Sequence, residues 1–123
     1  MLRGRTGAQS TLKGTSMKYG NKKIKTEDGV FDSKREYLRW CELKLMEKAH
    51  EITDLQRQVS FTLIPSQKYD GGTERPVKYV ADFVYYDKKA FLHVEDVKGV
   101  RTKDYIIKRK LMLKCFGVHV EEV

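Results

Sequence analysis

Two strand-like segments within residues 79–99 carry the side chains of this sequence that are best suited to chemistry. The first segment holds Asp82, and the second ends with Asp96 and, two residues later, Lys98. Two carboxylates can hold Mg²⁺, which prefers oxygen ligands, and a lysine beside them can orient an attacking water or stabilise negative charge. These are the parts of a metal-dependent phosphodiesterase. The structural alternative is ion pairing of both aspartates with Lys98 and Lys78, but acidic residues are depleted in strands, which favours the chemical interpretation.

The grouping of these side chains depends on how the two strands pair. Side chains alternate along a strand, so Asp96 faces one side of the sheet and Glu95 faces the other. A pairing of Tyr86 with Leu92 places the two aspartates opposite each other on one face, whereas a register shifted by one residue places Asp82 opposite Glu95. We prefer the first register because it brings both aspartates and the lysine together. A bulge near the site would change which side chains face the same side of the sheet.

A helix is predicted over residues 33–49, because apolar residues recur there at helical spacing around Leu38, Cys41 and Leu45. Ser33 followed three residues later by Glu36 is a capping box, in which the serine caps the first turn and the glutamate reaches back. The alternative is that Glu36 points at the edge of the sheet as a further metal or water ligand. The two roles remain open.

Turn signals and periodicity place the other elements. Asp28-Gly29 predicts a short hairpin before the first helix, and residues 66–76 read as a mobile loop. Thr102 is the expected N-cap of a second helix and Gly117 its C-terminal stop. The first three strands are joined by short loops and are expected to run antiparallel, whereas the last strand follows a helix and is expected to lie parallel to its neighbour. The prediction is an α/β fold with a mixed central sheet flanked by helices, in the order α-β-β-β-α-β, with elements at 33–49, 59–65, 77–86, 91–98, 103–116 and 118–123.

Composition limits the class of protein. The 123 residues suffice for one domain. A formal net charge of +8 favours a polyanionic partner, although charge alone does not separate a nucleic-acid enzyme from a ribosome-like structural binder. Cys41 and Cys115 form neither a disulfide framework nor a zinc site, so we expect core residues in a reducing cytosol. No apolar run is long enough to span a bilayer.

Residues 1–22 are predicted to form a flexible basic arm ahead of a single domain over residues 23–123. Seven Lys and Arg precede Glu27, and no acidic residue does. Such an arm lies along a phosphate backbone, exchanges with a partner subunit, or acts as a solubilising tail.

The sequence resembles the PD-(D/E)XK nuclease superfamily. The resemblance lies in Ala-Asp-Phe at 81–83 followed by Glu-Asp-Val-Lys-Gly at 95–99, with Phe-Asp-Ser-Lys-Arg-Glu at 31–36 similar to the helix segment that carries an upstream glutamate. The pattern is also similar to small phage-encoded proteins and, more distantly, to phage junction-resolving and very-short-patch repair endonucleases. Ala81 departs from the proline in the name of the superfamily.

The resemblance implies a restriction-endonuclease-like core and a Mg²⁺-dependent DNA endonuclease, with Mn²⁺ as a substitute metal. It implies that Asp82 and Asp96 are metal ligands, Lys98 the catalytic lysine and Glu36 an auxiliary ligand. Gln58 resembles a glutamine that precedes the first strand in some relatives, and a polar strand edge explains it equally well.

The expected partner is DNA, duplex or branched, as in phage recombination, junction resolution or nicking in the cytoplasm of a bacterial host. The alternative is a non-catalytic nucleic-acid-binding module that keeps the nuclease fold. A homodimer is expected because cutting two strands needs two sites. Predicted phosphate contacts lie on and just before the second helix: Arg101, Lys103, Lys108, Arg109 and Lys110.

Overall fold

The computed structural model describes residues 22–123, so nearly all of the predicted basic arm lies outside the described residues. The chain divides into two compact units between Leu38 and Arg39, and each unit is described by itself. Within the described residues, no helix is long and apolar enough to cross a membrane.

The first unit contains the predicted short hairpin. Strands β1 (Ile24–Thr26) and β2 (Gly29–Phe31) pair antiparallel. The Thr26 hydroxyl donates to the carbonyl of Gly29 at 2.9 Å, and Gly29 has a φ of 118°, which an L side chain rarely adopts. Helix α1 (Lys34–Lys48) begins after this hairpin and continues into the second unit. The hairpin and the start of the helix are therefore as the sequence predicts.

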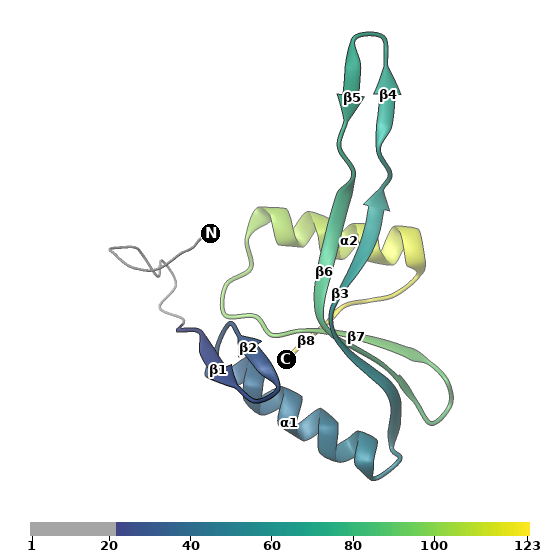
Figure 1. Cartoon of the computed structure of the whole chain (residues 1–123). Helices are drawn as coiled ribbons and strands as arrows, with labels where there is room; N and C mark the ends of the chain where they lie inside the picture. Colours follow the sequence, from purple (N-terminus) through teal and green to yellow (C-terminus); the bar gives the residue numbers. More distant parts are fainter. Residues whose placement is uncertain (1–21) are drawn as a thin grey trace. The chain divides into compact units, whose positions relative to one another are not determined.

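The second unit is built on one mixed sheet (Figure 1). Its strands lie in the order β3 (Ile52–Ile64), β6 (Val77–Asp87), β7 (Leu92–Asp96) and β8 (Glu121–Glu122). The first three strands pair antiparallel, and β8, which follows helix α2 (Lys103–Phe116), pairs parallel with β7. The predicted α/β class, the mixed sheet and the order of the elements are confirmed.

The segment predicted as a mobile loop is instead a second hairpin. Strands β4 (Gln67–Tyr69) and β5 (Gly72–Glu74) pair antiparallel with Tyr69 opposite Gly72. This leaves Asp70-Gly71 as a two-residue turn, and Gly71 has a φ of 129°. Asp-Gly is a strong hairpin signal. It determines the turn here although the residues around it are polar, which had favoured the loop prediction.

Strand β3 begins seven residues before its predicted start, at Ile52 opposite Asp87. The sequence did not indicate this part because β3 is an edge strand, and an edge strand tolerates polar residues that break the apolar alternation. The final strand is shorter than predicted, because β7 ends at Asp96 and offers β8 only two partners.

Apolar side chains cover both faces of the sheet. On one face, α2 contributes Tyr105 and Met112 to a cluster with buried residues of the strands. On the other face, Leu43 of α1 packs against Phe83, and Trp40 stacks on Phe83 with ring centroids 5.9 Å apart. The buried stripe of α1 therefore centres on Leu43, whereas Leu38 and Leu45, on which the predicted stripe was drawn, are exposed.

The caps of α2 explain its limits. The Thr102 hydroxyl accepts from the amide of Tyr105 at 3.1 Å, and Gly117 ends the helix with a φ of 69°. Both are the predicted caps. Cys115, predicted as a core residue, is exposed in the last turn of α2, and Cys41 is only partly buried.

Candidate active site

The register of β6 and β7 decides which acidic residues share a face. Tyr86 pairs with Leu92 and Phe83 pairs with Glu95. Continuing this register by one residue places Asp82 opposite Asp96. The preferred register is therefore confirmed, and the alternative that set Asp82 against Glu95 is wrong.

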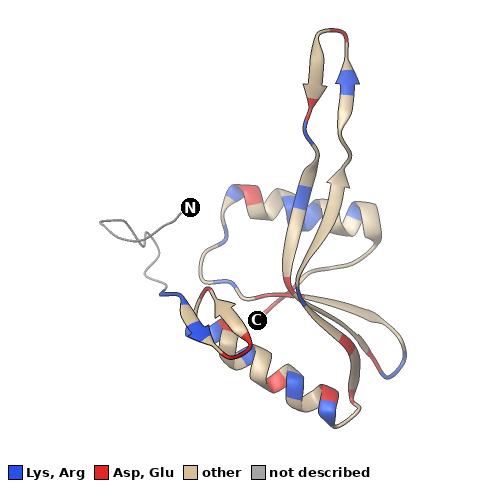
Figure 2. Cartoon of the chain, viewed as in Figure 1, with Lys and Arg blue, Asp and Glu red and all other residues tan. Residues whose placement is uncertain are grey.

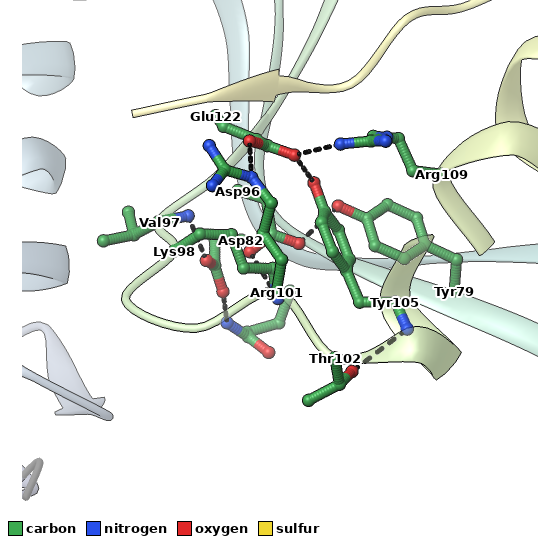
Figure 3. Close-up of polar contacts among 11 residues, drawn as sticks. Tyr79, Asp82, Asp96, Val97, Lys98, Arg101, Thr102, Tyr105, Arg109 and Glu122 are labelled. Atoms are coloured by element: carbon green, nitrogen blue, oxygen red, sulfur yellow. Dashed lines mark hydrogen bonds and ion pairs between the residues drawn. The ribbon is translucent and has the colours of Figure 1, made fainter. Parts of the chain in front are cut away.

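Asp96 is held at both carboxylate oxygens (Figure 3). The Tyr79 hydroxyl donates to Oδ2 at 2.6 Å, and the Lys98 ammonium lies 3.1 Å from Oδ1. Asp96 is 4 % exposed. Burial and then the hydrogen bond to Asp96 raise the pKa of Tyr79 far above its ordinary value, so this hydroxyl stays a neutral donor.

Asp82 is also held at both oxygens. Its Oδ2 accepts from the backbone amide of Val97 at 2.8 Å, and its Oδ1 accepts from the side-chain amide of Gln58 at 3.2 Å. Since Val97 lies between Asp96 and Lys98 in the chain, this bond ties Asp82 directly to the segment that carries the other two groups. The structure thus brings Asp82, Asp96 and Lys98 together, with Gln58 beside them.

Gln58 adopts an uncommon backbone conformation. Its φ is 52°, in the left-handed region, although it lies inside β3. Non-glycine residues in this region cost free energy and often lie at functional sites. The strain coincides with the residue that reaches Asp82, which favours a role for Gln58 over an incidental polar strand edge.

Lys98 lies over an aromatic ring from α2. Its Nζ is 4.0 Å from the centroid of Tyr105, at a distance where the ring attracts the cation. The Tyr105 hydroxyl in turn donates to Glu122 of β8 at 2.8 Å. Burial and this hydrogen bond raise the pKa of Tyr105 above its ordinary value. Residues of β7, α2 and β8 therefore position Lys98, with Glu122 acting through Tyr105.

Glu122 engages two of the predicted phosphate contacts. Arg101 donates to it at 2.6 Å and Arg109 at 2.9 Å. Burial by itself would raise the pKa of Glu122, but hydrogen bonds from Tyr105, Arg101 and Arg109 lower it to about 2. Both guanidinium groups are therefore partly neutralised by the carboxylate of Glu122.

The three lysines predicted as phosphate contacts on α2 differ in their surroundings. Lys108 is partly buried and pairs with Asp104 at 3.4 Å. Lys103 and Lys110 are exposed and take part in no ion pair within residues 22–123. Of the predicted contacts, these two are the cations most available to an external anion.

Glu95 faces the opposite side of the sheet from Asp96. It is 1 % exposed and receives both Nε and Nη2 of Arg39, at 2.8 and 2.6 Å, together with the Tyr85 hydroxyl. The hydrogen bond to Glu95 raises the pKa of Arg39 above its ordinary value. Glu95 is thus a buried structural carboxylate.

Glu36 belongs to the first unit. Its backbone amide donates to the Ser33 hydroxyl at 3.1 Å, so the serine half of the predicted capping box is confirmed. Its role as a metal ligand stays a prediction.

The donor set is compatible with Mg²⁺. Two carboxylates from opposite register positions supply hard oxygen ligands, and Mg²⁺ is commonly held by one or two carboxylates together with waters and substrate phosphate. No group of three or more His, Cys, Asp or Glu side chains in the described part of the chain is arranged to hold a metal ion. Asp82 and Asp96 would supply two of the oxygen ligands of such an ion.

Three site residues were not predicted: Tyr79, Tyr105 and Glu122. Tyr79 lies in the same strand as Asp82, and Tyr105 lies three residues after the N-cap of α2, but neither position carries a motif. Only the parallel pairing of β8 with β7 brings Glu122 to the site.

No curated protein and no solved structure matches this chain. A family model described as a protein of unknown function (DUF1064) matches residues 16–121, which span the hairpin of the first unit and all of the elements around Asp82 and Asp96. The chain belongs to the DUF1064 family.

Proposed function

We propose that this protein is a Mg²⁺-dependent endonuclease that hydrolyses phosphodiester bonds in DNA. The observation that carries the proposal is the grouping of Asp82, Asp96 and Lys98, through the amide of Val97 and the 3.1 Å contact of Lys98 with Asp96. The resemblance of this motif to PD-(D/E)XK nucleases, together with the α-β-β-β-α-β order of the core, supports the same reaction.

Each residue has a role in this proposal. Asp82 and Asp96 hold Mg²⁺, with Mn²⁺ as a substitute, and the resemblance implies Glu36 as an auxiliary ligand. When bound, the metal neutralises phosphate charge and makes a bound water more acidic. The Lys98 side chain is 25 % exposed, so its ammonium can leave Asp96 to donate to a phosphate oxygen. Gln58 orients the carboxylate of Asp82.

The proposed substrate is duplex or branched DNA, with junction resolution or nicking in the host cytoplasm as the setting. The formal charge of +8 supports a polyanionic substrate. Lys103 and Lys110 are the expected phosphate contacts on α2, and Arg101, Lys108 and Arg109 contribute after exchange of their carboxylate partners. A homodimer would supply the two sites needed to cut both strands.

One observation favours a second candidate, a DNA-binding module without activity. Each carboxylate oxygen of Asp82 and Asp96 already accepts a hydrogen bond or faces the Lys98 ammonium, as expected of carboxylates kept for stability.

The test compares cleavage of supercoiled plasmid and of a four-way junction by the wild type and by Asp96→Asn, with Mg²⁺ or Mn²⁺. We expect Asp96→Asn to lose about 10²-fold or more in cleavage rate, because it removes a carboxylate that would hold the metal stabilising the charge on the reacting phosphate. Glu51→Gln is the matched control, since it removes one exposed carboxylate outside the site and should cut like the wild type. Binding without cutting by the wild type would establish the second candidate instead.

A further inference from the structure

The hairpin β4–β5 projects beyond the central sheet as a separate two-stranded ribbon (Figure 1). The pairing register is the same on both sides of its base, with Ile64 opposite Val77 and Gln67 opposite Glu74. The only two prolines of the chain, at 65 and 76, therefore stand opposite each other between the sheet and the ribbon. Because proline has no backbone N–H, the ladder is interrupted there.

The ribbon adds no core to the protein. All six strand residues are exposed. Tyr69, its largest side chain, is 59 % exposed and lies across the glycines of its own turn, so that a Cβ on Gly72 would come within 2.9 Å of the tyrosine oxygen. The ribbon is thus internally supported and contributes no burial against the rest of the fold, which indicates that it serves a partner.

Charge is segregated between the two faces of the ribbon. Lys68 stands opposite Thr73, and continuation of the register sets Ser66 opposite Arg75. Since opposite residues and alternate residues share a face, these four side chains lie together and present two cations with no acid. Lys68 and Arg75 are exposed, and neither takes part in an ion pair within residues 22–123. Figure 2 shows the basic segments on the ribbon.

This basic face continues the face of the sheet that carries Tyr79. Along β6 and the residues before it, Arg75, Val77 and Tyr79 alternate onto one side, and the Tyr79 hydroxyl contacts Asp96. At about 3.3 Å per residue, Arg75 lies about 13 Å from Tyr79 along the strand, and the level of Lys68 lies about 20 Å from it. At about 3.4 Å per base pair, these distances correspond to about 4–6 base pairs.

We propose that the β4–β5 ribbon is an arm that binds the backbone of duplex DNA about 4–6 base pairs from the bond that is cut. The inference rests on the proposed function and names a surface for its substrate. A two-stranded ribbon is narrow enough to enter the major groove, and Lys68 and Arg75, which share one face of the ribbon, contact the phosphate backbone, which positions the duplex without reading its sequence.

The test is binding of fluorescein-labelled four-way junctions in EDTA, where no cutting occurs, by the wild type and by Lys68→Ala/Arg75→Ala. The double variant should bind junctions with 12-base-pair arms about tenfold more weakly at 0.1 M salt, and its log–log salt slope should be shallower by about 2, as for two lost phosphate contacts. Lys88→Ala/Lys89→Ala is the matched control, because it removes two exposed lysines from the turn after β6 and should bind like the wild type.

Arm length gives a second readout that a change in fold would not produce. Shortening the arms from 12 to 4 base pairs should weaken the wild type but leave the double variant nearly unchanged. Equal affinity and slope of the double variant and the wild type would overturn the inference and leave the proposed function intact. A wild-type protein that binds no junction would overturn both the inference and the proposed function. A wild-type dimer that becomes a monomer in the double variant, by sedimentation, would assign the ribbon to a second copy of the chain and overturn the inference.

Discussion

Two of the contacts of Lys98 make contributions that can be separated. It is ion-paired with Asp96 at 3.1 Å, and it lies 4.0 Å from the centre of the Tyr105 ring. In the proposed function, a metal on Asp96 would change the ion pair, whereas the Tyr105 ring would keep its charge distribution. Tyr105 therefore keeps the ammonium near the site in either condition, and we regard it as a positioning residue for Lys98.

Replacing Tyr105 tests this role. In the proposed cleavage reaction, Tyr105→Leu removes the ring and should lower kcat about fivefold with little change in KM, since a cation–π contact is worth about 1 kcal/mol. Tyr105→Phe keeps the ring, loses only the hydrogen bond to Glu122, and should retain most of the wild-type kcat. Steady-state cleavage assays with thermal unfolding of both variants give the answer. Equal losses of kcat in both variants would assign the effect to Glu122 instead.

At the scale of elements, helix α1 is joined to β7 by a buried ion pair. Arg39 donates to both oxygens of Glu95, which is 1 % exposed, and also contacts the exposed Glu42 at 3.0 Å. Removing one partner of a buried pair leaves an uncompensated charge, which costs far more than losing an exposed pair.

Arg39→Met should therefore lower the free energy of unfolding by about 3 kcal/mol. Glu42→Gln, the control that removes only the exposed partner, should lower it by less than about 0.5 kcal/mol. Urea denaturation at neutral pH measures both. Similar values for the two variants would contradict a structural role for the pair of Arg39 with Glu95.

His93 joins the end of β6 to β8. Its ring lies between Asp87 at 2.8 Å and Glu121 at 2.7 Å and stacks on Tyr85. The hydrogen bond to Asp87 and then the one to Glu121 raise the pKa of His93 above its ordinary value of 6.5, against the opposing effect of burial. A raised pKa means that the protonated ring stabilises the folded state fully below pH 6.5, and that this stabilisation is lost as the pH rises through the raised value.

His93→Asn should accordingly unfold at lower urea concentration than the wild type at pH 6, and the difference should narrow by pH 9. His119→Asn, which replaces an exposed histidine, is the control and should show no such trend. A difference that is the same at both pH values would assign the role of His93 to stacking on Tyr85.

At the scale of the whole molecule, the excess of basic residues is unevenly distributed along the sequence. The chain has 25 Lys and Arg against 17 Asp and Glu, and residues 1–21 contain four of the basic residues and no acidic one. In the second unit, by contrast, carboxylates engage several cations, including Arg39, Arg101 and Arg109. Residues 1–21 therefore carry four of the eight positive charges in the formal net charge of +8.

Replacing Arg3, Arg5, Lys13 and Lys18 by alanine in the full chain tests that contribution. If all four contact phosphates, the log–log salt slope of duplex binding should be shallower by about 3–4. Fluorescence anisotropy between 50 and 200 mM salt measures the slope. An unchanged slope would identify residues 1–22 as a solubilising tail.

Local signals in the sequence were sufficient for much of the fold. Asp28-Gly29, Thr102 and Gly117 act within a few residues, and each marks the turn or helix end that it predicts. Strand alternation was enough to place Asp96 and Lys98 on one face and Glu95 on the other. The pairing that sets Asp82 opposite Asp96 was preferred because it groups both aspartates with Lys98, and the observed register agrees with it.

Only the tertiary structure decided what surrounds those residues. Tyr79 meets Asp96 across 17 positions of sequence, Tyr105 meets Glu122 across 17, and Arg39 meets Glu95 across 56. Propensity, capping and periodicity describe a residue and its near neighbours, whereas these contacts depend on how the helices pack on the sheet and on the parallel pairing of β8. For the same reason, the sequence indicated that Arg101 and Arg109 are basic, but packing determined that Glu122 engages both.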